Sequence, residues 1–285
     1  MTINGLNAFL KKKEILPKKM LLEKLRGKRV VIDAQQFFYK FKYRASKNLG
    51  DVYLMTKDKN IFLDYITEEI VKVNKNFTRN DIDVTFVFDG KAPKEKRETQ
   101  TKRREIIKEK KKKLKEEFTL ENIKKDVSLE EDEMKSIVES LMKLNVKVHI
   151  DEFREAECAC AKLIKEGKAD WVYSEDCDIF AHLCPFIIRS IQGNYITVIA
   201  LETVLRKLEM DKESFLNFCV MCGTDYNKNL PGLGPGKLFK IMRDEEYEMR
   251  KIVKNIKSKG RNFEDLNFTR TRQLFMSEVD KYFIN

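Results

Sequence analysis

The sequence lacks the features of a membrane or secreted protein. No apolar run approaches the roughly 18–20 residues that a membrane span needs. Residues 1–20 contain no apolar core of a signal peptide. The six cysteines stand in apolar or motif-bearing segments, not in loops where disulfide bonds could stabilise a small fold. We therefore expect an intracellular protein in a reducing compartment that does not act on a membrane.

Histidine and tryptophan are scarce as well. The chain has two histidines and one tryptophan. We expect His149 and His182 to be structural and Trp171 to begin a core strand. Cys219 and Cys222 form a CxxC pair, but no second pair stands at the spacing of zinc ligands, so a zinc site is not favoured.

Length and net charge indicate the number of domains and the kind of binding partner. The 285 residues, 42% of them hydrophobic, suffice for one large domain with an insertion or for two modest domains. The net charge of +11 indicates a polyanionic partner, because each phosphate that Lys or Arg neutralises releases a counterion. Charge alone does not separate nucleic acid from a membrane surface.

Strand and helix patterns alternate along the chain. Short β-branched runs predict strands at residues 29–33, 81–89, 146–150 and 171–174, and a hairpin of 186–189 with 195–200. Apolar residues at helical spacing predict helices at residues 61–77, 156–165 and 214–222, and in the charged tail beyond Arg243. Such alternation is typical of an α/β fold with a mainly parallel sheet flanked by helices.

A further helix is expected after a capping box formed by Ser128 and Glu131. Its apolar face would consist of Met134, Ile137, Val138, Leu141 and Met142. Between the second and third expected strands, residues 91–115 hold thirteen basic residues against four acidic ones, so this segment is an excursion that could face a polyanion or simply be a solvated helix.

Acidic residues stand where the apolar strands end. Asp33 closes VVID, Asp89 closes FVFD, and Asp176 and Asp178 follow WVYS. Ligands of open α/β sheets bind outside the carboxyl ends of the strands, so carboxylates there would converge on one spot. Any one of these acids could be a solvated loop carboxylate, but the set is hard to assemble by chance.

Three more acids extend this set. Glu155 and Glu157 would diverge inside a helix but can reach one site from its first turn. Asp225 lies just past an expected helix, in GTDY. Seven clustered carboxylates need cations to neutralise them. Oxygen ligands favour Mg²⁺, for which Mn²⁺ can substitute, and two such ions ~4 Å apart can clamp a phosphodiester for hydrolysis.

The motifs VVID, FVFDG, EAE, SEDCD and CGTDY, in this order, resemble those of the flap endonuclease family, the XPG-like structure-specific 5′ nucleases. The resemblance covers nearly the whole chain, from INGL to about Arg243. It implies a PIN-like 5′-nuclease domain over residues 1–285, with a basic helical arch inserted at residues 91–128 and a helix-hairpin-helix motif at residues 223–243. It also implies that seven acids bind metal: Asp33, Asp89, Glu155, Glu157, Asp176, Asp178 and Asp225.

The resemblance also assigns roles to basic and aromatic residues. Lys96 and Arg103 match a Lys and an Arg of the family's arch that approach the scissile phosphate, so both are expected to be catalytic. Tyr39 matches an aromatic residue on which the base next to the cut stacks, a contact that tolerates any base. Arg104 is expected to contact DNA.

The glycine-rich segment LPGLGPGK, residues 230–237, resembles the hairpin of the family's helix-hairpin-helix. Glycines let the backbone approach a phosphate, and a helix N-terminus then offers N–H groups. Gly232, Gly234, Gly236 and Lys237 are therefore expected to bind DNA, and the family also holds K⁺ there through carbonyls. The chain departs from the family at Gly236, where a larger residue is usual, and at Thr2, where a glycine is usual.

The resemblance implies an endonuclease that cuts 5′ flaps near the single-strand/double-strand junction, with 5′–3′ exonuclease activity, in DNA replication, repair or recombination. Asp89 and Glu155 stand 66 positions apart. This separation fits flap-cutting and double-strand exonuclease members, whereas excision-type members carry a very long insert. A catalytically silent nucleic-acid scaffold of the same fold and a metal-dependent ribonuclease are the alternatives.

The expected partner is branched or 5′-flap DNA, bound by a monomer. Residues 273–276 lack the spacing of a sliding-clamp peptide, so no clamp is expected as a partner. The expected location is the nucleus or a viral DNA replication site.

Overall fold

The computed structural model describes residues 3–90 and 97–276. In the helix at Arg97–Glu116, the side chains of residues 97–100, 102–104, 111, 113 and 115 are not described. The chain divides into two compact units. We call Leu25–Ala156 the central unit, and Met1–Lys24 together with Glu157–Asn285 the terminal unit.

Parallel strands form the sheet of the central unit. β2 (Arg29–Asp33), β3 (Asp83–Phe88) and β4 (Val148–Ile150) pair in this order, and both pairings are parallel. Val30, Val31 and Ile32 are all buried, so β2 is covered on both faces, as strands of parallel sheets usually are. The register sets Asp33 opposite Val87, and the carboxyl ends of β2 and β3 therefore lie side by side.

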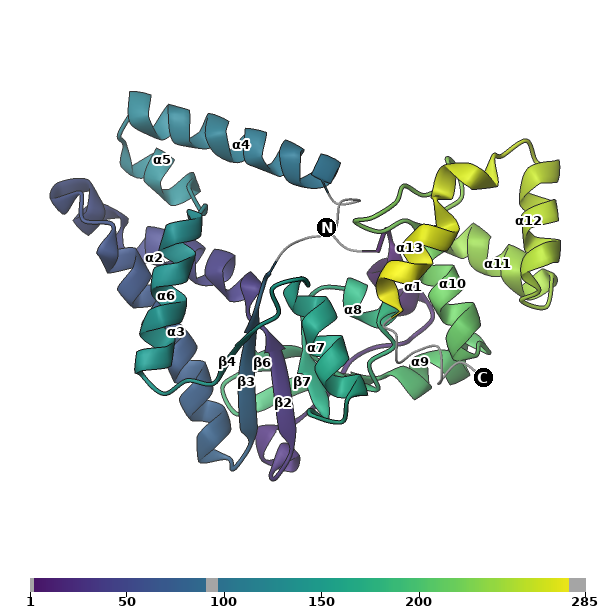
Figure 1. Ribbon diagram of the computed structural model, residues 1–285, viewed down its shortest axis with the longest axis horizontal. Coiled ribbons are helices and arrows are strands. Elements are labelled where there is room, and N and C mark those ends of the chain that lie inside the picture. Colours follow the sequence, from purple (N-terminus) through teal and green to yellow (C-terminus); the bar gives the residue numbers. More distant parts are fainter. Residues whose placement is uncertain (1–2, 91–96, 277–285) are drawn as a thin grey trace. The chain divides into compact units, whose positions relative to one another are not determined.

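Two long helices cover this sheet. α2 (Gln35–Thr56) follows β2 directly, and α3 (Asn60–Arg79) packs along it (Figure 1). Aromatic rings fix α2 to the strands, because Phe38 stacks on Phe88 at 5.0 Å and Phe37 lies 6.4 Å from Phe86. α6 (Glu131–Lys143) packs against α3.

The basic segment forms α4 (Arg97–Glu116), and α5 (Leu120–Lys125) follows it. α5 packs against α2 at Gly50, where an added Cβ would lie 2.9 Å from the Leu120 side chain. Glycine at this position lets the two helices approach closely.

The terminal unit has a mixed group of strands. β5 (Trp171–Tyr173) pairs in parallel with β6 (Phe186–Gln192), which forms an antiparallel hairpin with β7 (Tyr195–Ala200). β1 (Lys18–Leu21) pairs antiparallel with the far side of β7. Gly193 at the hairpin has φ +57°, which a glycine adopts without strain.

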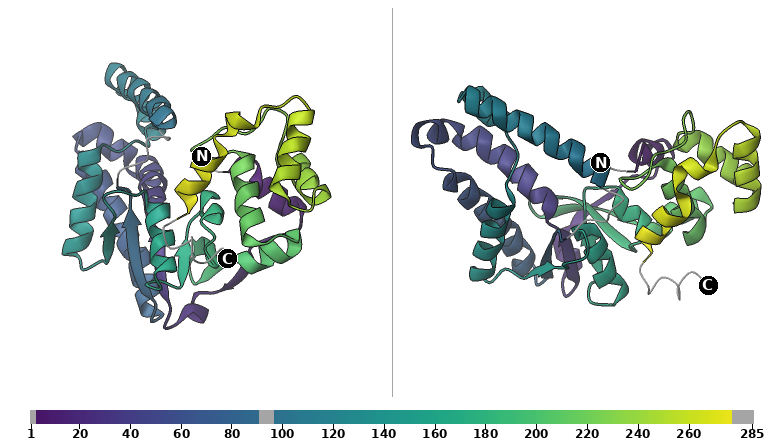
Figure 2. Two further views of the ribbon diagram at one scale, coloured as in Figure 1. Left: turned by 45° about the vertical axis from the view of Figure 1, so that its right-hand side comes forward. Right: turned by 45° about the horizontal axis from the view of Figure 1, so that its top comes forward.

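Helices make up most of the terminal unit. α7 (Ala156–Lys165), the short α8 (Asp178–Ala181) and α9 (Leu201–Leu208) are interspersed with the strands. α10 (Lys212–Cys222), α11 (Pro235–Asp244), α12 (Met249–Ser258) and α13 (Phe268–Phe275) form a group together with α1 (Leu6–Lys12) (Figure 2). Residues 214–222 of α10 are all buried, and α11 and α13 pack against this helix.

The expected α/β class with a mainly parallel sheet and flanking helices is confirmed, and the expected strands and helices are present with small shifts at their ends. Two expectations are wrong. The capping box consists of Glu130 and Glu133, because the Ser128 hydroxyl instead bonds Asp126 at 2.5 Å. Met142 is 49% exposed and does not join the buried face of α6.

Several elements were not expected from the sequence. They include the long helix α2, the shorter helices α1 and α9, and the strand β1. Across the part of the chain that the structure describes, no helix combines the length and the apolar character that a membrane crossing requires.

Candidate active site

Two of the predicted acids stand at adjacent strand ends in the central unit. Asp33 is the last residue of β2, and Asp89 directly follows β3. Asp33 is buried, and the Gln36 side chain donates hydrogen bonds to its Oδ2 at 3.2 Å and to its backbone carbonyl at 3.0 Å. The parallel pairing of β2 with β3 thus brings these two carboxylates to one edge of the sheet, as the sequence predicts.

A tight backbone contact fixes Glu155 beside Asp89. The Ala156 N–H donates to Asp89 Oδ1 at 2.8 Å, and the Gly90 N–H donates to the Arg154 carbonyl at 2.9 Å. An added Cβ at Gly90 would lie 1.9 Å from the Asp151 carbonyl oxygen, so only glycine fits here. Glu155, between Arg154 and Ala156, is buried. The central unit therefore gathers three of the seven acids.

Asp176 and Asp178 lie in the loop after β5 of the terminal unit. Asp178 begins α8, is 1% exposed, and donates its backbone N–H to Asp176 Oδ1 at 3.2 Å. The guanidinium group of Arg189 in β6 holds this loop by donating to three consecutive carbonyls. These are the carbonyls of Ser174 at 2.7 Å, Glu175 at 2.8 Å and Asp176 at 2.5 Å.

Glu157 and Asp225 complete the set in the terminal unit. Glu157 occupies the first turn of α7, and Asp225 lies in the turn after α10; both are buried. The turn is held by the Thr224 hydroxyl, which donates to Asn227 Oδ1 at 2.8 Å. Tyr226, next to Asp225, donates its hydroxyl to Glu157 Oε1 at 3.4 Å, which links the two segments.

The acids of the terminal unit influence one another electrostatically. Burial raises the pKa of the Asp176 carboxyl, and the negative charge of Asp225 raises it further, although backbone N–H groups of Asp178 and Cys177 lower it. Buried like charges of this kind are costly without a cation. The ligand atoms are all carboxylate oxygens, which suit a hard divalent ion such as Mg²⁺.

Within residues 3–90 and 97–276, no three His, Cys, Asp or Glu side chains stand close enough together to hold a metal ion as they are placed. The structure thus groups Asp33, Asp89 and Glu155 in one unit and the other four acids in the second unit.

The predicted basic residues are only partly visible. Lys96 lies outside the described residues, and Arg103 and Arg104 are described only as backbone positions within α4. Tyr39 stands in the second turn of α2, six positions after Asp33, and its side chain is 45% exposed. An exposed ring so close in sequence to the acids suits stacking against a base.

The glycine-rich segment forms the turn between α10 and α11. Gly232 has φ +71°, and Gly234 caps the N-terminus of α11, with Pro235 in its first turn and no side chain as cap. No atom lies within 4 Å of an added Cβ at Gly234 or Gly236, so the backbone is open there. The Lys237 ammonium group donates to the Gly232 carbonyl at 3.4 Å.

The CxxC pair is a core feature. Cys219 and Cys222 are fully buried in α10, and burial raises the pKa of both thiols far above the ordinary range. Thiols that stay protonated are poor zinc ligands. His182 is buried too and packs edge-on against the Phe275 ring at 5.0 Å, in keeping with the structural role expected for it.

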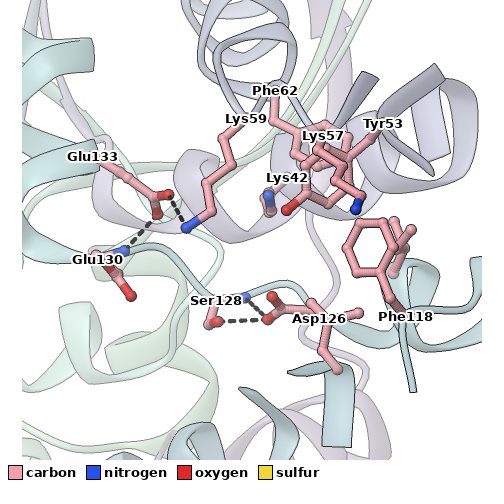
Figure 3. Close-up of a pocket in the computed structure, with 12 residues that line it drawn as sticks. Lys42, Tyr53, Lys57, Lys59, Phe62, Phe118, Asp126, Ser128, Glu130 and Glu133 are labelled. Atoms are coloured by element: carbon pink, nitrogen blue, oxygen red, sulfur yellow. Dashed lines mark hydrogen bonds and ion pairs between the residues drawn. The ribbon is translucent and has the colours of Figure 1, made fainter. Parts of the chain in front are cut away.

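A separate cavity of about 360 Å³ lies in the central unit, where α4 and α5 meet α2, α3 and the start of α6 (Figure 3). Its wall includes the rings of Tyr53, Phe62 and Phe118, and the buried Lys42 ammonium group lies 3.7 Å from the Phe62 ring centre. Carboxylates balance its lysines, since Lys59 pairs with Glu133 at 3.8 Å. None of the seven acids lines this cavity.

Sequence reasoning missed three residues that shape the site. Arg189 is the only charged residue in β6, and an arginine directly after the apolar run FII was the available signal. Gly90 directly follows the strand-ending Asp89, and Tyr226 directly follows Asp225, so proximity to an acid could have drawn attention to both. Their partners are 13 to 69 positions away in the chain, which no local pattern reveals.

Solved structures place the fold among XPG-like 5′ nucleases. The catalytic core of Rad2, in complex with a DNA substrate, is similar with a TM-score of 0.65 and 23% sequence identity, over 97% of this chain and 77% of that one. Flap endonuclease-1 from Methanococcus jannaschii is similar with a TM-score of 0.58 and 20% identity, over 91% of this chain and 82% of that one. The protein thus has the 5′-nuclease, PIN-like fold.

Sequence comparisons narrow this class. The XPG N-terminal domain matches residues 1–110, and the XPG I-region matches residues 148–225. Flap endonuclease 1 of Saccharomyces cerevisiae (strain YJM789) is 31% identical over 296 residues, spanning 97% of this chain and 75% of that protein. Flap endonuclease 1 of Debaryomyces hansenii is 29% identical over 300 residues, 100% of this chain and 76% of that protein. The chain belongs to the flap endonuclease family of XPG-like nucleases.

Proposed function

We propose that this protein is a metal-dependent, structure-specific DNA endonuclease that cuts 5′ flaps near the single-strand/double-strand junction and also degrades DNA in the 5′–3′ direction. The observation that carries the proposal is the placement of the acids. Each of the seven stands at a strand end, in the loop after a strand, at or just before the start of a helix, or in the turn after a helix, and five are buried. Membership of the flap endonuclease family supports the same reaction.

The seven acids are proposed to hold two Mg²⁺ ions, for which Mn²⁺ can substitute. Bound ions of this kind supply a water nucleophile at neutral pH and stabilise the charge on the phosphate that is cut. The protein's contribution is to hold the carboxylates. Gln36 orients Asp33, the Ala156 N–H orients Asp89, and Arg189 fixes the loop that carries Asp176 and Asp178.

Basic and aromatic groups are proposed to hold the DNA. Lys96 and Arg103 act at the scissile phosphate, and Arg104 contacts the strand beside it. Tyr39 offers an exposed ring for the base next to the cut. The net charge of +11 favours the approach of a polyanion to an acidic site.

The turn before α11 is proposed to grip the duplex. Its open backbone at Gly234 and Gly236, together with the uncapped N-terminus of α11, suits a phosphate. Gly232 contributes a carbonyl and Lys237 a positive charge, and the same turn could hold K⁺ through carbonyls, as the family resemblance implies.

A catalytically silent scaffold of the same fold and a metal-dependent ribonuclease are the rival functions. A silent scaffold has no need of a complete set of acids, and none of the seven is missing here. A ribonuclease with a four-acid site needs neither a basic arch nor a glycine-rich hairpin, whereas this chain has a basic segment at residues 91–115 and a glycine-rich segment at residues 230–237. We further propose action in DNA replication, repair or recombination, as a monomer, in the nucleus or at a viral DNA replication site.

A panel of end-labelled substrates tests the proposal. The panel contains a 5′ flap, a gapped duplex, a four-way junction, a blunt duplex and single-stranded RNA, each with Mg²⁺, Mn²⁺, Ca²⁺ or EDTA. We expect the 5′ flap to be cut fastest with Mg²⁺, cutting to persist with Mn²⁺, and none with EDTA. Ca²⁺ should support binding without cutting, because it coordinates oxygen with looser geometry. Binding without cleavage of any substrate would indicate the scaffold, and preferred cleavage of RNA would indicate the ribonuclease.

A further inference from the structure

A buried cluster of polar and aromatic side chains lies behind Glu157 in the terminal unit. We call it the Tyr226 cluster; it consists of Glu157, Cys158, His182, Tyr226 and Phe275. Tyr226 is 5% exposed, and its hydroxyl lies 3.4 Å from Glu157 Oε1 and 3.9 Å from Cys158 Sγ. The hydroxyl therefore sits between the first-turn residues of α7, one of which is a proposed metal ligand.

The ring of Tyr226 is fixed from the other side by the last helix of the described chain. Phe275, the last residue of α13, is 2% exposed and contacts the Tyr226 ring at 5.3 Å with an interplanar angle of 66°. It also contacts the His182 ring at 5.0 Å, and His182 Nε2 lies 3.6 Å from Cys158 Sγ. Edge-to-face contacts of this kind are directional, so they define the orientation of the phenol.

Backbone contacts near Tyr226 define its position further. The Tyr226 N–H donates to Thr224 Oγ1 at 3.1 Å, and Thr224 Oγ1 in turn donates to Asn227 Oδ1 at 2.8 Å. The backbone and the ring of Tyr226 are thus both held by neighbouring groups, and these contacts set the position of the hydroxyl beside Glu157.

From these contacts we propose that Tyr226 is a positioning residue for the Glu157 carboxylate, and that α13 supports the metal site through Phe275. This inference rests on the proposed function. A glutamate side chain has several rotamers, and a hydrogen bond to Oε1 restricts them, so the carboxylate is held in one orientation. Phe275 takes no part in the proposed chemistry, but its buried ring contacts Tyr226, the residue directly after Asp225, and a supporting role accounts for its position.

Tyr226→Phe tests the proposal, because it keeps the ring contacts with Phe275 and removes only the hydroxyl. We expect the apparent affinity for a divalent ion to fall about 10-fold, which is the usual effect of removing a group that hydrogen-bonds a metal ligand. The measurement is a calorimetric titration of the DNA-free protein with Mn²⁺. Cleavage of a 5′ flap should need correspondingly more Mg²⁺, whereas the Kd for flap DNA in Ca²⁺ should change less than about 2-fold.

Tyr247→Phe is the matched control. The Tyr247 hydroxyl donates to the Leu208 carbonyl at 2.9 Å in the same unit, so this variant also loses one tyrosine hydrogen bond, here a partly buried one, but affects none of the seven acids directly. We expect it to leave the Mn²⁺ affinity unchanged. If Tyr226→Phe and Tyr247→Phe behave alike in the titration, the positioning role of Tyr226 is wrong.

Phe275→Leu tests the part played by α13. This substitution keeps an apolar side chain but loses the edge-on ring contacts, so it should weaken Mn²⁺ binding about 3-fold while the protein stays folded by circular dichroism. Tyr226→Phe combined with Phe275→Leu should be no weaker than Tyr226→Phe alone, because Phe275 acts through the hydroxyl. Additive losses would overturn the link between α13 and the site.

The proposed function and the positioning role of Tyr226 would be disproved by different results. If the wild-type protein cuts none of the branched substrates, the proposed function fails, while the Mn²⁺ titration still measures the effect of Tyr226 on the acids. If the wild-type protein cuts flaps and both substitutions leave metal affinity unchanged, only the inference on Tyr226 and Phe275 fails.

Discussion

At the scale of single residues, Asp178 is the most buried of the seven acids, with 1% of its surface exposed. Its backbone N–H is engaged by Asp176, and the loop that carries it is held by Arg189. A carboxylate that is buried and ionised is costly unless a cation neutralises it. Its burial fits the proposed role in binding metal.

Asp178→Asn should abolish cleavage and preserve binding. The amide is nearly the same size as the carboxylate but carries no negative charge, so the site loses a ligand for the proposed ion. We expect the single-turnover rate on a 5′ flap to fall by about 1,000-fold, several kcal/mol of transition-state stabilisation. The Kd for flap DNA in Ca²⁺ should stay within about 3-fold, because binding depends on basic groups. Asp64→Asn, at an exposed acid of α3, is the control, and a wild-type rate for Asp178→Asn would refute the assignment.

Arg189 fixes the loop that carries Asp176 and Asp178 by binding backbone carbonyls of the loop, not the carboxylates of these two acids. Arg189→Lys keeps the charge but cannot reach three carbonyls with one ammonium group. We expect a loss of roughly 1–3 kcal/mol of stability in urea denaturation and a higher Mg²⁺ requirement for cleavage. Arg206→Lys, at an exposed position of α9, should change neither. A Mg²⁺ requirement equal to that of the wild type would limit Arg189 to a role in stability.

The sequence predicts the strand-ending acids because an apolar strand and its terminal carboxylate are neighbours in the chain. It does not predict Arg189, Gly90 or Tyr226, because their roles depend on partners brought near by the fold. Gly90, for example, is required only because the Asp151 carbonyl lies where a Cβ would be.

At the scale of elements, α4 and α5 pack on the rest of the central unit through a small apolar contact. Phe118, between the two helices, meets the Tyr53 ring edge-on at 5.4 Å, and Ile123 of α5 is buried beside Tyr53 and Phe62. The cavity in Figure 3 lies at this junction. α5 is therefore anchored on α2 and α3, and α4 directly precedes it in the chain.

Lys96→Ala and Arg103→Ala test whether α4 and the segment before it serve catalysis. A positive group that acts on charge developing at one phosphate lowers the barrier more than it strengthens binding. We expect each variant to cut at least 10-fold more slowly in single turnover at saturating DNA, with less than about a 3-fold change in Kd. Lys108→Ala, an exposed lysine later in α4, is the control. A loss of affinity with an unchanged rate at saturation would mean that the segment is only a general DNA grip.

Elements differ in how well the sequence predicts them. The buried strands and the amphipathic α3 are predicted because their apolar spacing is strong. β1 is not, because KKML at the sheet edge carries two exposed lysines and no apolar alternation. α6 begins two residues later than the sequence predicts. The Ser128 hydroxyl donates to Asp126, so Glu130 and Glu133 form the capping box in place of Ser128 and Glu131, and residue spacing alone does not distinguish these two arrangements.

At the scale of the whole molecule, the DNA contacts that we propose are made with phosphates and base faces, and none of them reads the edge of a base. The net charge is +11, the turn before α11 has an open backbone, and Tyr39 offers an exposed ring. Contacts with phosphates position a protein on DNA without specifying sequence, and stacking tolerates every base. No recognition helix or zinc finger is evident in the sequence. Selection must then come from the geometry of the DNA.

Moving the junction along a fixed sequence tests this conclusion directly. A set of 5′-flap substrates shares one sequence, and the branch point is shifted in steps of two nucleotides. If geometry is read, the cut should move with the branch point and keep a constant distance from it. Affinity should also fall at least 10-fold between about 50 and 200 mM salt, because several phosphates are neutralised at once. Product lengths on a sequencing gel give the positions of the cuts, and a cut that stays with one base sequence while the branch moves would show that the enzyme reads bases.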